Sequence, residues 1–282
     1  MNTPQRSAQI STRARPIIGL LDSGISQHQL PQLHSAAAFC TESAAAFCTE
    51  SAAAFCTESA ATFCTKSAAT SRQQSSLNQT DYQDRLGHGS TLAQVLIDQV
   101  PQIQLCVARI FDRKLTASAS QTAAGIDWLV AAGVQVINLS FGLRQDRLPL
   151  AQACQRALDA GVVLVAASPA MGEPVYPARY PGVIRVTGDA RCQPNQYSWS
   201  PSRQADFGAC VRAGHPQVIG ASVAAAYISA RVGRYLQAHP GRPLDATHLQ
   251  EWLREGAFYQ GAQRPFALIP WARRLTWQGG AL

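Results

Sequence analysis

The stretch Ile18-Gly19-Leu20-Leu21-Asp22-Ser23-Gly24-Ile25 runs from small and apolar residues into a carboxylate and a turn. Counted from Pro16, its apolar part is long enough for a strand that is buried on both faces in a parallel sheet. In sheets of this kind, ligands bind at the carboxyl ends of the strands. Because Asp22 stands at such an end, the stretch predicts a buried strand that carries a functional carboxylate.

Outward from this stretch, apolar runs alternate with segments of helical periodicity. This alternation predicts an α/β fold with three layers, in which a mostly parallel sheet has helices on both faces. The expected strands are residues 16–22, 104–111, 134–140, 162–167 and 183–187, and the expected helices are residues 88–99, 120–132, 148–160, 222–238 and 247–255, the last with Asp245 as a candidate cap.

The length and composition of the chain fit one domain. Its 282 residues are 46% hydrophobic, which is enough for a buried sheet and one core. We expect a polar, basic tail over residues 1–15, with an organellar transit segment as the alternative, and a single domain over residues 16–282. The tail lacks the apolar segment of a secretion signal, and no apolar run approaches the roughly 20 residues of a membrane span. A membrane is therefore not an expected partner.

The cysteine pattern argues against a disulfide framework and against a metal site. Four of the eight cysteines occupy the same position of a repeated octad, and the other four are isolated. No Cys-x-x-Cys pair occurs, so a zinc site and a bound cofactor are not expected. Free thiols together with the absence of a secretion signal predict a reducing, cytoplasmic location.

The octad Ser-Ala-Ala-Ala-Phe-Cys-Thr-Glu is repeated in tandem over residues 35–66, with small changes in its last copy. Eight residues are too few for a folding unit of the repeat architectures. We expect one copy to form a strand and the others to form an insertion that bulges out as a loop. The alternative is a segment that binds a partner or drives oligomerisation, and the oligomeric state is left open.

The net charge is +7. This charge has two interpretations. The basic residues either form a solvated surface, or they create an electrostatic field that attracts an acidic peptide or protein substrate. Nucleic acid is not an expected partner, because the basic residues are scattered and no platform of aromatic and basic side chains occurs.

Two further motifs carry chemistry, Gly87-His88-Gly89-Ser90 and Gly220-Ala221-Ser222-Val223. A serine hydroxyl is a poor nucleophile at neutral pH unless a base takes its proton. Ser222 is the candidate nucleophile, His88 the candidate base, and Asp22 the candidate residue that orients the imidazole. Because Ser222 stands where a helix is expected to begin, its backbone N–H and the helix dipole can stabilise an oxyanion.

The order Asp, His, Ser in these motifs resembles that of the subtilisin-like serine peptidases, or subtilases. The segments Val136-Ile-Asn-Leu-Ser140-Phe-Gly142 and Tyr176-Pro-Ala-Arg-Tyr-Pro181 are also similar to segments of that family. The resemblance implies a subtilisin-like fold and a serine endopeptidase that acts through an acyl-enzyme. It also implies that Ser140, Phe141 and Gly142 bind the substrate backbone as an added strand.

The sequence departs from the family pattern at the oxyanion site. Subtilases follow the strand that corresponds to residues 162–167 with Gly-Asn, and the Asn side chain donates to the oxyanion. Here the segment reads Ala167-Ser168-Pro169-Ala170, so the usual Asn donor is absent near Ala170. Loss of one such donor costs about 10²–10³ in rate. Ser168 or a donor from elsewhere is an open substitute.

A second departure concerns calcium. Secreted subtilases often interrupt the helix after the catalytic histidine with a calcium-binding loop, whereas here residues 88–99 lead directly toward the strand at Gln104. Calcium prefers six to eight oxygen ligands, and few carboxylates occur nearby. We therefore expect no bound metal. With only about 15 residues before the first strand, a compact intracellular type without a propeptide is expected.

Three interpretations from different classes follow. The first is a cytoplasmic serine endopeptidase of narrow specificity that processes a peptide or protein. The second is a catalytically weak or dead homologue that binds peptides or assists assembly, suggested by the missing donor near Ala170. The third is a structural or assembly protein that acts through the octads.

Overall fold

The computed structural model describes residues 15–39, 79–214, 216–240 and 246–261. In these ranges the strands form one nine-stranded sheet, in the order β2-β3-β1-β4-β5-β6-β8-β7-β9. The strands are β1 (Ile17–Asp22), β2 (Leu33–Ala38), β3 (Gln104–Arg109), β4 (Val136–Leu139), β5 (Val163–Ala167), β6 (Ile184–Gly188), β7 (Tyr197–Trp199), β8 (Phe207–Ala209) and β9 (Tyr259–Gln260).

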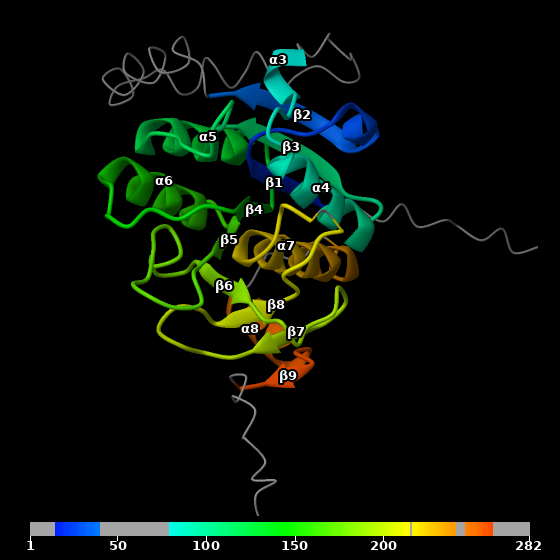
Figure 1. The fold of residues 1–282 in the computed structure, drawn as a ribbon, viewed down its shortest axis with the longest axis vertical. Coiled ribbons are helices and arrows are strands. Elements are labelled where there is room, and N and C mark those ends of the chain that lie inside the picture. The colour runs from blue at the N-terminus through cyan, green and yellow to red at the C-terminus, as the bar shows by residue number, and fades with distance from the viewer. Residues whose placement is uncertain (1–14, 40–78, 215, 241–245, 262–282) are drawn as a thin grey trace, which may run out of the picture.

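Helices cover both faces of this sheet, which confirms the predicted three-layer α/β fold (Figure 1). Helices α5 and α6 pack on one face, while α4 and α7 pack against each other on the opposite face. The helices are η1 (Gln27–Gln32, a 3-10 helix), α3 (Gln79–Tyr82), α4 (His88–Gln99), α5 (Ala119–Ala131), α6 (Leu148–Asp159), α7 (Ala221–Ala238) and α8 (Ala246–Glu255).

The first strand lies inside the sheet, as its apolar sequence predicts. β1 pairs in parallel with β3 on one side and with β4 on the other, and the side chains of Ile18, Leu20 and Leu21 are fully buried. Leu21 is in register with Leu139, the last residue of β4. Asp22 and Ser140, the next residue of each chain segment, therefore emerge side by side at the same edge of the sheet.

The sheet also contains strands that the sequence pattern did not indicate. β7 runs antiparallel to β8, and β9 adds to β7 at the edge. These strands are two or three residues long, which is too short for an alternating or apolar pattern to be recognised. The sheet is therefore mostly parallel, with one antiparallel pair.

One copy of the octad contributes a strand, as expected. β2 includes residues 35–38, the first half of the first copy, and pairs in parallel with β3. The copies over residues 43–66, and the candidate cap Asp245, lie outside the described residues.

The four described cysteines are buried free thiols, with no disulfide between them. Burial raises the pKa of Cys106 to about 11, and burial together with nearby Asp127 raises the pKa of Cys154 to about 12. Both thiols are therefore protonated at neutral pH and unsuited to nucleophilic chemistry.

Candidate active site

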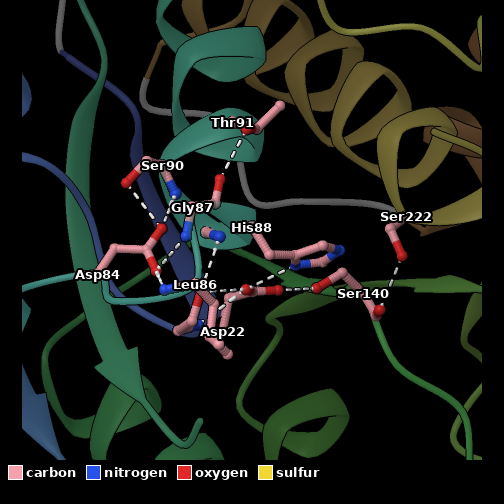
Figure 2. A network of polar contacts seen from close by, with 11 residues as sticks. Asp22, Asp84, Leu86, Gly87, His88, Ser90, Thr91, Ser140 and Ser222 are labelled. Atoms are coloured by element: carbon pink, nitrogen blue, oxygen red, sulfur yellow. Dashed lines mark hydrogen bonds and ion pairs between the residues drawn. The ribbon is translucent and has the colours of Figure 1, made fainter. Parts of the chain in front are cut away.

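The histidine and the aspartate of the predicted triad are in direct contact. Asp22 is the last residue of β1 and is fully buried, and His88 is the first residue of α4. Nδ1 of His88 lies 2.8 Å from Oδ1 of Asp22 (Figure 2). A carboxylate in this position fixes the tautomer of the imidazole, so that Nε2 is the free basic nitrogen.

The Asp22 carboxylate accepts hydrogen bonds on both oxygens. Oδ1 also accepts from the backbone N–H of Ser23 at 2.8 Å and from its hydroxyl at 3.1 Å, and Oδ2 accepts from the hydroxyl of Ser140. A buried charge requires this kind of compensation. The contacts of Ser23 and Ser140 thus satisfy the buried Asp22 carboxylate and hold it in one orientation.

The glycine after His88 allows the start of α4 to lie close to the Asp22 turn. A Cβ at Gly89 would collide with the carbonyl oxygen of Gly24 and would lie 3.2 Å from Oδ1 of Asp22. The Gly89 N–H donates to the hydroxyl of Ser23 at 2.9 Å. The Gly in the His-Gly motif is therefore required by the close approach that brings His88 to Asp22.

Asp84 is a positioning residue that the sequence analysis missed. Its Oδ1 accepts from the backbone N–H groups of Leu86 and Gly87, both at 2.9 Å, and its Oδ2 accepts from the N–H of Ser90 at 2.8 Å and its hydroxyl at 2.7 Å (Figure 2). A carboxylate at the N-terminus of α4 also suits the helix dipole. The signal in the sequence was an Asp just before an expected helix start.

Two carboxylates determine the proton affinity of His88. Burial alone would lower its pKa, but the hydrogen bond that His88 donates to Asp22, the charge of Asp22 and the charge of Asp84 outweigh burial, and the pKa is raised above 6.5. A base must be neutral to accept a proton, so activity that depends on His88 is lost as the pH falls through this raised value.

We therefore expect kcat/KM to rise with pH, with a midpoint above the ordinary histidine value of 6.5. Asp84→Asn should move the midpoint to lower pH, because one of the charges that stabilise the imidazolium is removed. The measurement is a pH profile of kcat/KM. Asp98→Asn, which removes a carboxylate at the other end of α4, is the matched control. An unchanged midpoint in Asp84→Asn would contradict the assignment.

Ser222 lies at the start of the helix that packs against α4. It is the second residue of α7, after Gly220, whose φ of 101° is in the range that favours glycine. The Ser222 hydroxyl donates to the carbonyl oxygen of Ser140 at 2.9 Å (Figure 2). In the described part of the chain it makes no hydrogen bond to His88, so the direct contact through which a base takes the proton of its nucleophile is absent from this conformation.

Ser140 connects the two halves of the site. Its side chain is bonded to Asp22, and its backbone carbonyl is bonded to Ser222. In Figure 2, the imidazole of His88 is seen between the side chains of Asp22 and Ser222. A rotation of the Ser222 side chain about χ1 to another staggered position would redirect its hydroxyl away from the carbonyl of Ser140.

Within the segment Ser140 to Gly142, the backbone groups of Phe141 and Gly142 are available for a ligand. Phe141 packs edge-on against Phe111, with ring centroids 6.5 Å apart. The next residue, Leu143, exchanges two backbone hydrogen bonds with Tyr176. Phe141 and Gly142 make no backbone hydrogen bonds to other described residues, so an extended peptide could pair with them as an added strand.

The oxyanion site has one donor on a helix terminus. Ser222 is the second residue of α7, so its backbone N–H has no hydrogen-bond acceptor within the helix. Ala170, at the position where the usual Asn donor is absent, lies in an exposed segment after β5. The hydroxyl of nearby Ser168 is buried and has no partner among the described residues.

Two features of the described ranges concern metals and membranes. No group of three or more His, Cys, Asp or Glu side chains is arranged to hold a metal ion within those ranges. None of the helices described is both long and apolar enough to cross a membrane.

Comparison with known proteins identifies the family. The model of the subtilase family matches residues 13–268, nearly the whole chain. The chain belongs to the subtilase family. Asp22, His88 and Ser222, the residues on which the resemblance was based, all fall within the matched region.

Sequence similarity to two curated subtilases covers part of the chain. The chain is 32% identical over 120 residues to the minor extracellular protease Epr of Bacillus subtilis, and this match covers 38% of this chain and 19% of that protein. It is 31% identical over 120 residues to the thermostable alkaline protease of Halalkalibacterium halodurans, covering 39% of this chain and 33% of that protein. The chain thus matches less than half the length of these curated relatives.

A solved structure supports the fold of this subtilase. The crystal structure of a cold adapted subtilisin-like serine proteinase aligns with a TM-score of 0.57 and 17% identity, covering 90% of this chain and 87% of the other. The three-layer α/β architecture is therefore the subtilisin-like fold expected from the sequence.

Proposed function

We propose that this subtilase is a serine endopeptidase that hydrolyses peptide bonds through an acyl-enzyme. One observation carries the proposal: at the carboxyl edge of the sheet, a buried Asp22 holds His88 through a 2.8 Å contact, and the start of α7 brings Ser222 to the same place. Membership of the subtilase family supports the same assignment.

In the proposed reaction, the hydroxyl oxygen of Ser222 attacks the carbonyl carbon of the peptide bond while Nε2 of His88 takes the hydroxyl proton. The carbonyl oxygen becomes an oxyanion, stabilised by the backbone N–H of Ser222 and the positive end of α7. His88 then donates its proton to the leaving nitrogen as the C–N bond breaks, and an ester on Ser222 remains.

Hydrolysis of the ester completes the cycle. His88 takes a proton from a water molecule, whose oxygen attacks the ester carbon, and then returns the proton to the oxygen of Ser222 as the C–O bond breaks. The Asp22 carboxylate accepts from Nδ1 of His88 and stabilises the imidazolium in both steps. The free acid leaves and the Ser222 hydroxyl is restored.

We also propose an acidic peptide or protein as substrate, a narrow specificity, and a cytoplasmic location. The net charge of +7 supports the first, because it attracts acidic chains. The buried free thiols of the described cysteines agree with a reducing compartment.

A second candidate function is peptide binding without efficient catalysis. Two observations favour it: the Ser222 hydroxyl is bonded to the Ser140 carbonyl rather than to His88, and Ala170 has no side-chain donor. In this case the Ser140 to Gly142 segment would bind an extended peptide that is not cleaved.

Labelling with a fluorophosphonate, which reacts with activated serines, separates the two functions. The peptidase proposal expects labelling of the full chain that is lost in Ser222→Ala and retained in Ser120→Ala, a control at an exposed serine of α5. Folding of each variant is checked by circular dichroism. A folded chain that is not labelled would favour the peptide-binding function.

Activity should not depend on calcium. Helix α4 is continuous from His88 to Gln99, and β3 begins at Gln104 after a short turn, so no calcium-binding loop is inserted there. We expect the melting temperature and kcat/KM to be unchanged by EDTA. A loss of both that added calcium restores would contradict this expectation.

The octads remain a candidate assembly segment. We expect deletion of residues 43–66 to leave the oligomeric state unchanged, as for an inserted loop. Light scattering of the full chain and the deletion variant measures this, and a change of state would support the assembly interpretation.

A further inference from the structure

A pocket of about 220 Å³ lies where β5 ends, with Ser168 after β5 and Arg185 of β6 in its lining. Its inner surface includes the buried residues Ser168 and Ala178, each 1% exposed. Its volume exceeds the roughly 30 Å³ share of one water molecule several times. It is lined by Ser168, Pro174, Ala178, Arg179, Arg185, Arg203 and Gln204.

Three guanidinium groups line this pocket, and two of them pair with carboxylates of the described residues. Arg185 forms a two-point contact with Asp206, at 3.0 and 2.5 Å, and Arg203 pairs with Glu173 at 3.0 Å. Arg179 lies over the ring of Tyr176, 5.6 Å from its centroid, and pairs with no carboxylate in the described ranges. The pocket therefore has an excess of positive charge, to which the exposed Arg179 contributes.

The pocket also contains an unused hydrogen-bond donor. The Ser168 hydroxyl is buried and has no hydrogen-bond partner among the described residues, although its backbone N–H is bonded to the carbonyl of Val186 at 2.8 Å. A buried hydroxyl without a partner is unfavourable by itself. A negatively charged oxygen in the pocket would accept from Ser168 and pair with Arg179.

The position of the pocket connects it with the substrate segment. Ser168 follows β5 and Ser140 follows the neighbouring β4, and the register of the two strands places Ser140 level with Ala167. Adjacent strands lie about 4.8 Å apart. Tyr176, which supports Arg179, exchanges backbone hydrogen bonds with Leu143, directly after Gly142. These contacts connect the pocket lining, through Ser168 and Tyr176, with the segment along which a peptide would pair.

We propose that this pocket binds the carboxylate of an aspartate or glutamate side chain in the peptide substrate, with Arg179 as the charge partner and Ser168 as a hydrogen-bond donor. The inference rests on the proposed function, because it assigns a specificity to the same cleft. Such a pocket would give the protein a preference for an acidic residue at one position of the substrate, in addition to the attraction from its net positive charge.

The test uses two matched sets of ten-residue peptides that are otherwise neutral. In one set a single glutamate is placed at each position in turn, and in the other set a single glutamine takes the same positions. Both binding to the full-length Ser222→Ala protein and cleavage by the unmodified chain are measured. At one position we expect glutamate to be preferred over glutamine by about tenfold in Kd, as for a charge-assisted hydrogen bond. Where cleavage occurs, kcat/KM should show the same preference.

Variants separate the pocket from the general charge of the protein. Arg179→Gln should reduce the glutamate preference to about one, and Ser168→Ala should reduce it in part. Arg254→Gln removes the same charge from an exposed position on α8, and it should keep the preference.

The outcomes distinguish the two proposals. No glutamate preference in binding, or a preference that Arg179→Gln retains, would overturn the pocket assignment even if peptides are cleaved. Glutamate-selective binding that Arg179→Gln abolishes, without cleavage of any peptide, would support the pocket and count against the peptidase function.

Discussion

Asp22→Asn is expected to lower kcat by about 10⁴-fold, with a small change in KM, because it removes the charge that orients and stabilises the His88 imidazolium. Both Asp22 oxygens accept hydrogen bonds, from Ser23 and His88 on one side and from Ser140 on the other. An amide has only one accepting oxygen. The NH₂ group of the new asparagine must therefore face either His88 or the hydroxyl of Ser140. If it faces His88, it donates to Nδ1 and enforces the wrong tautomer of the imidazole. If it faces Ser140, it cannot accept the hydrogen bond that the Ser140 hydroxyl now donates to Oδ2.

The measurement is steady-state cleavage of a fluorogenic peptide, with circular dichroism as a check on folding. Asp127→Asn is a suitable control, since Asp127 is an exposed carboxylate paired with Arg156 at 2.7 Å between α5 and α6. It should leave kcat near that of the unmodified chain. A folded Asp22→Asn protein that retains kcat within tenfold would mean that His88 does not act as a base supported by Asp22.

The elements that could be predicted from sequence are those in which burial dictates the residue type over several positions. β1 is a continuous apolar run because both of its neighbours are parallel strands and helices cover its faces. The triad residues stand at the ends of such elements, where Asp22 closes β1 and His88 opens α4. Their convergence at one edge follows from the parallel direction of the strands.

Other features depend on contacts between segments that are distant in the chain. The side chain of Ser140 binds Asp22 across 118 positions, and no local pattern indicates such a contact. The pocket combines Ser168 and Arg179 with Arg203 from a later loop, so neither its charge nor its unpaired hydroxyl can be recognised from a single stretch. Rotamers, such as that of Ser222, are likewise set by neighbouring atoms in three dimensions.

The second large effect is expected from Ala170→Asn, which should raise kcat by up to about 10²-fold with little change in KM. A side-chain donor near the oxyanion acts mainly in the transition state, so it lowers the barrier without strengthening substrate binding. Ala170 is exposed, so the larger side chain displaces no core residue. The segment is anchored on both sides, by the Ser168 N–H on the Val186 carbonyl at 2.8 Å and by Gln204 on the Gly172 carbonyl at 2.6 Å.

Ala170→Asp is the matched control, because it has the same shape as the asparagine variant but cannot donate when ionised. It should leave kcat unchanged or lower it, since a carboxylate repels the oxyanion. The effect of Ala170→Asn requires a backbone path that directs the new side chain toward the oxyanion. Pro169 sets this path, because it restricts the backbone of Ser168 and leads the chain into position 170. A folded Ala170→Asn protein with unchanged or lower kcat would show that another group already stabilises the oxyanion, or that the site is built from different donors. With measurable cleavage by the unmodified chain, that outcome would also count against the peptide-binding alternative, because the absent asparagine would no longer imply a weakened catalyst.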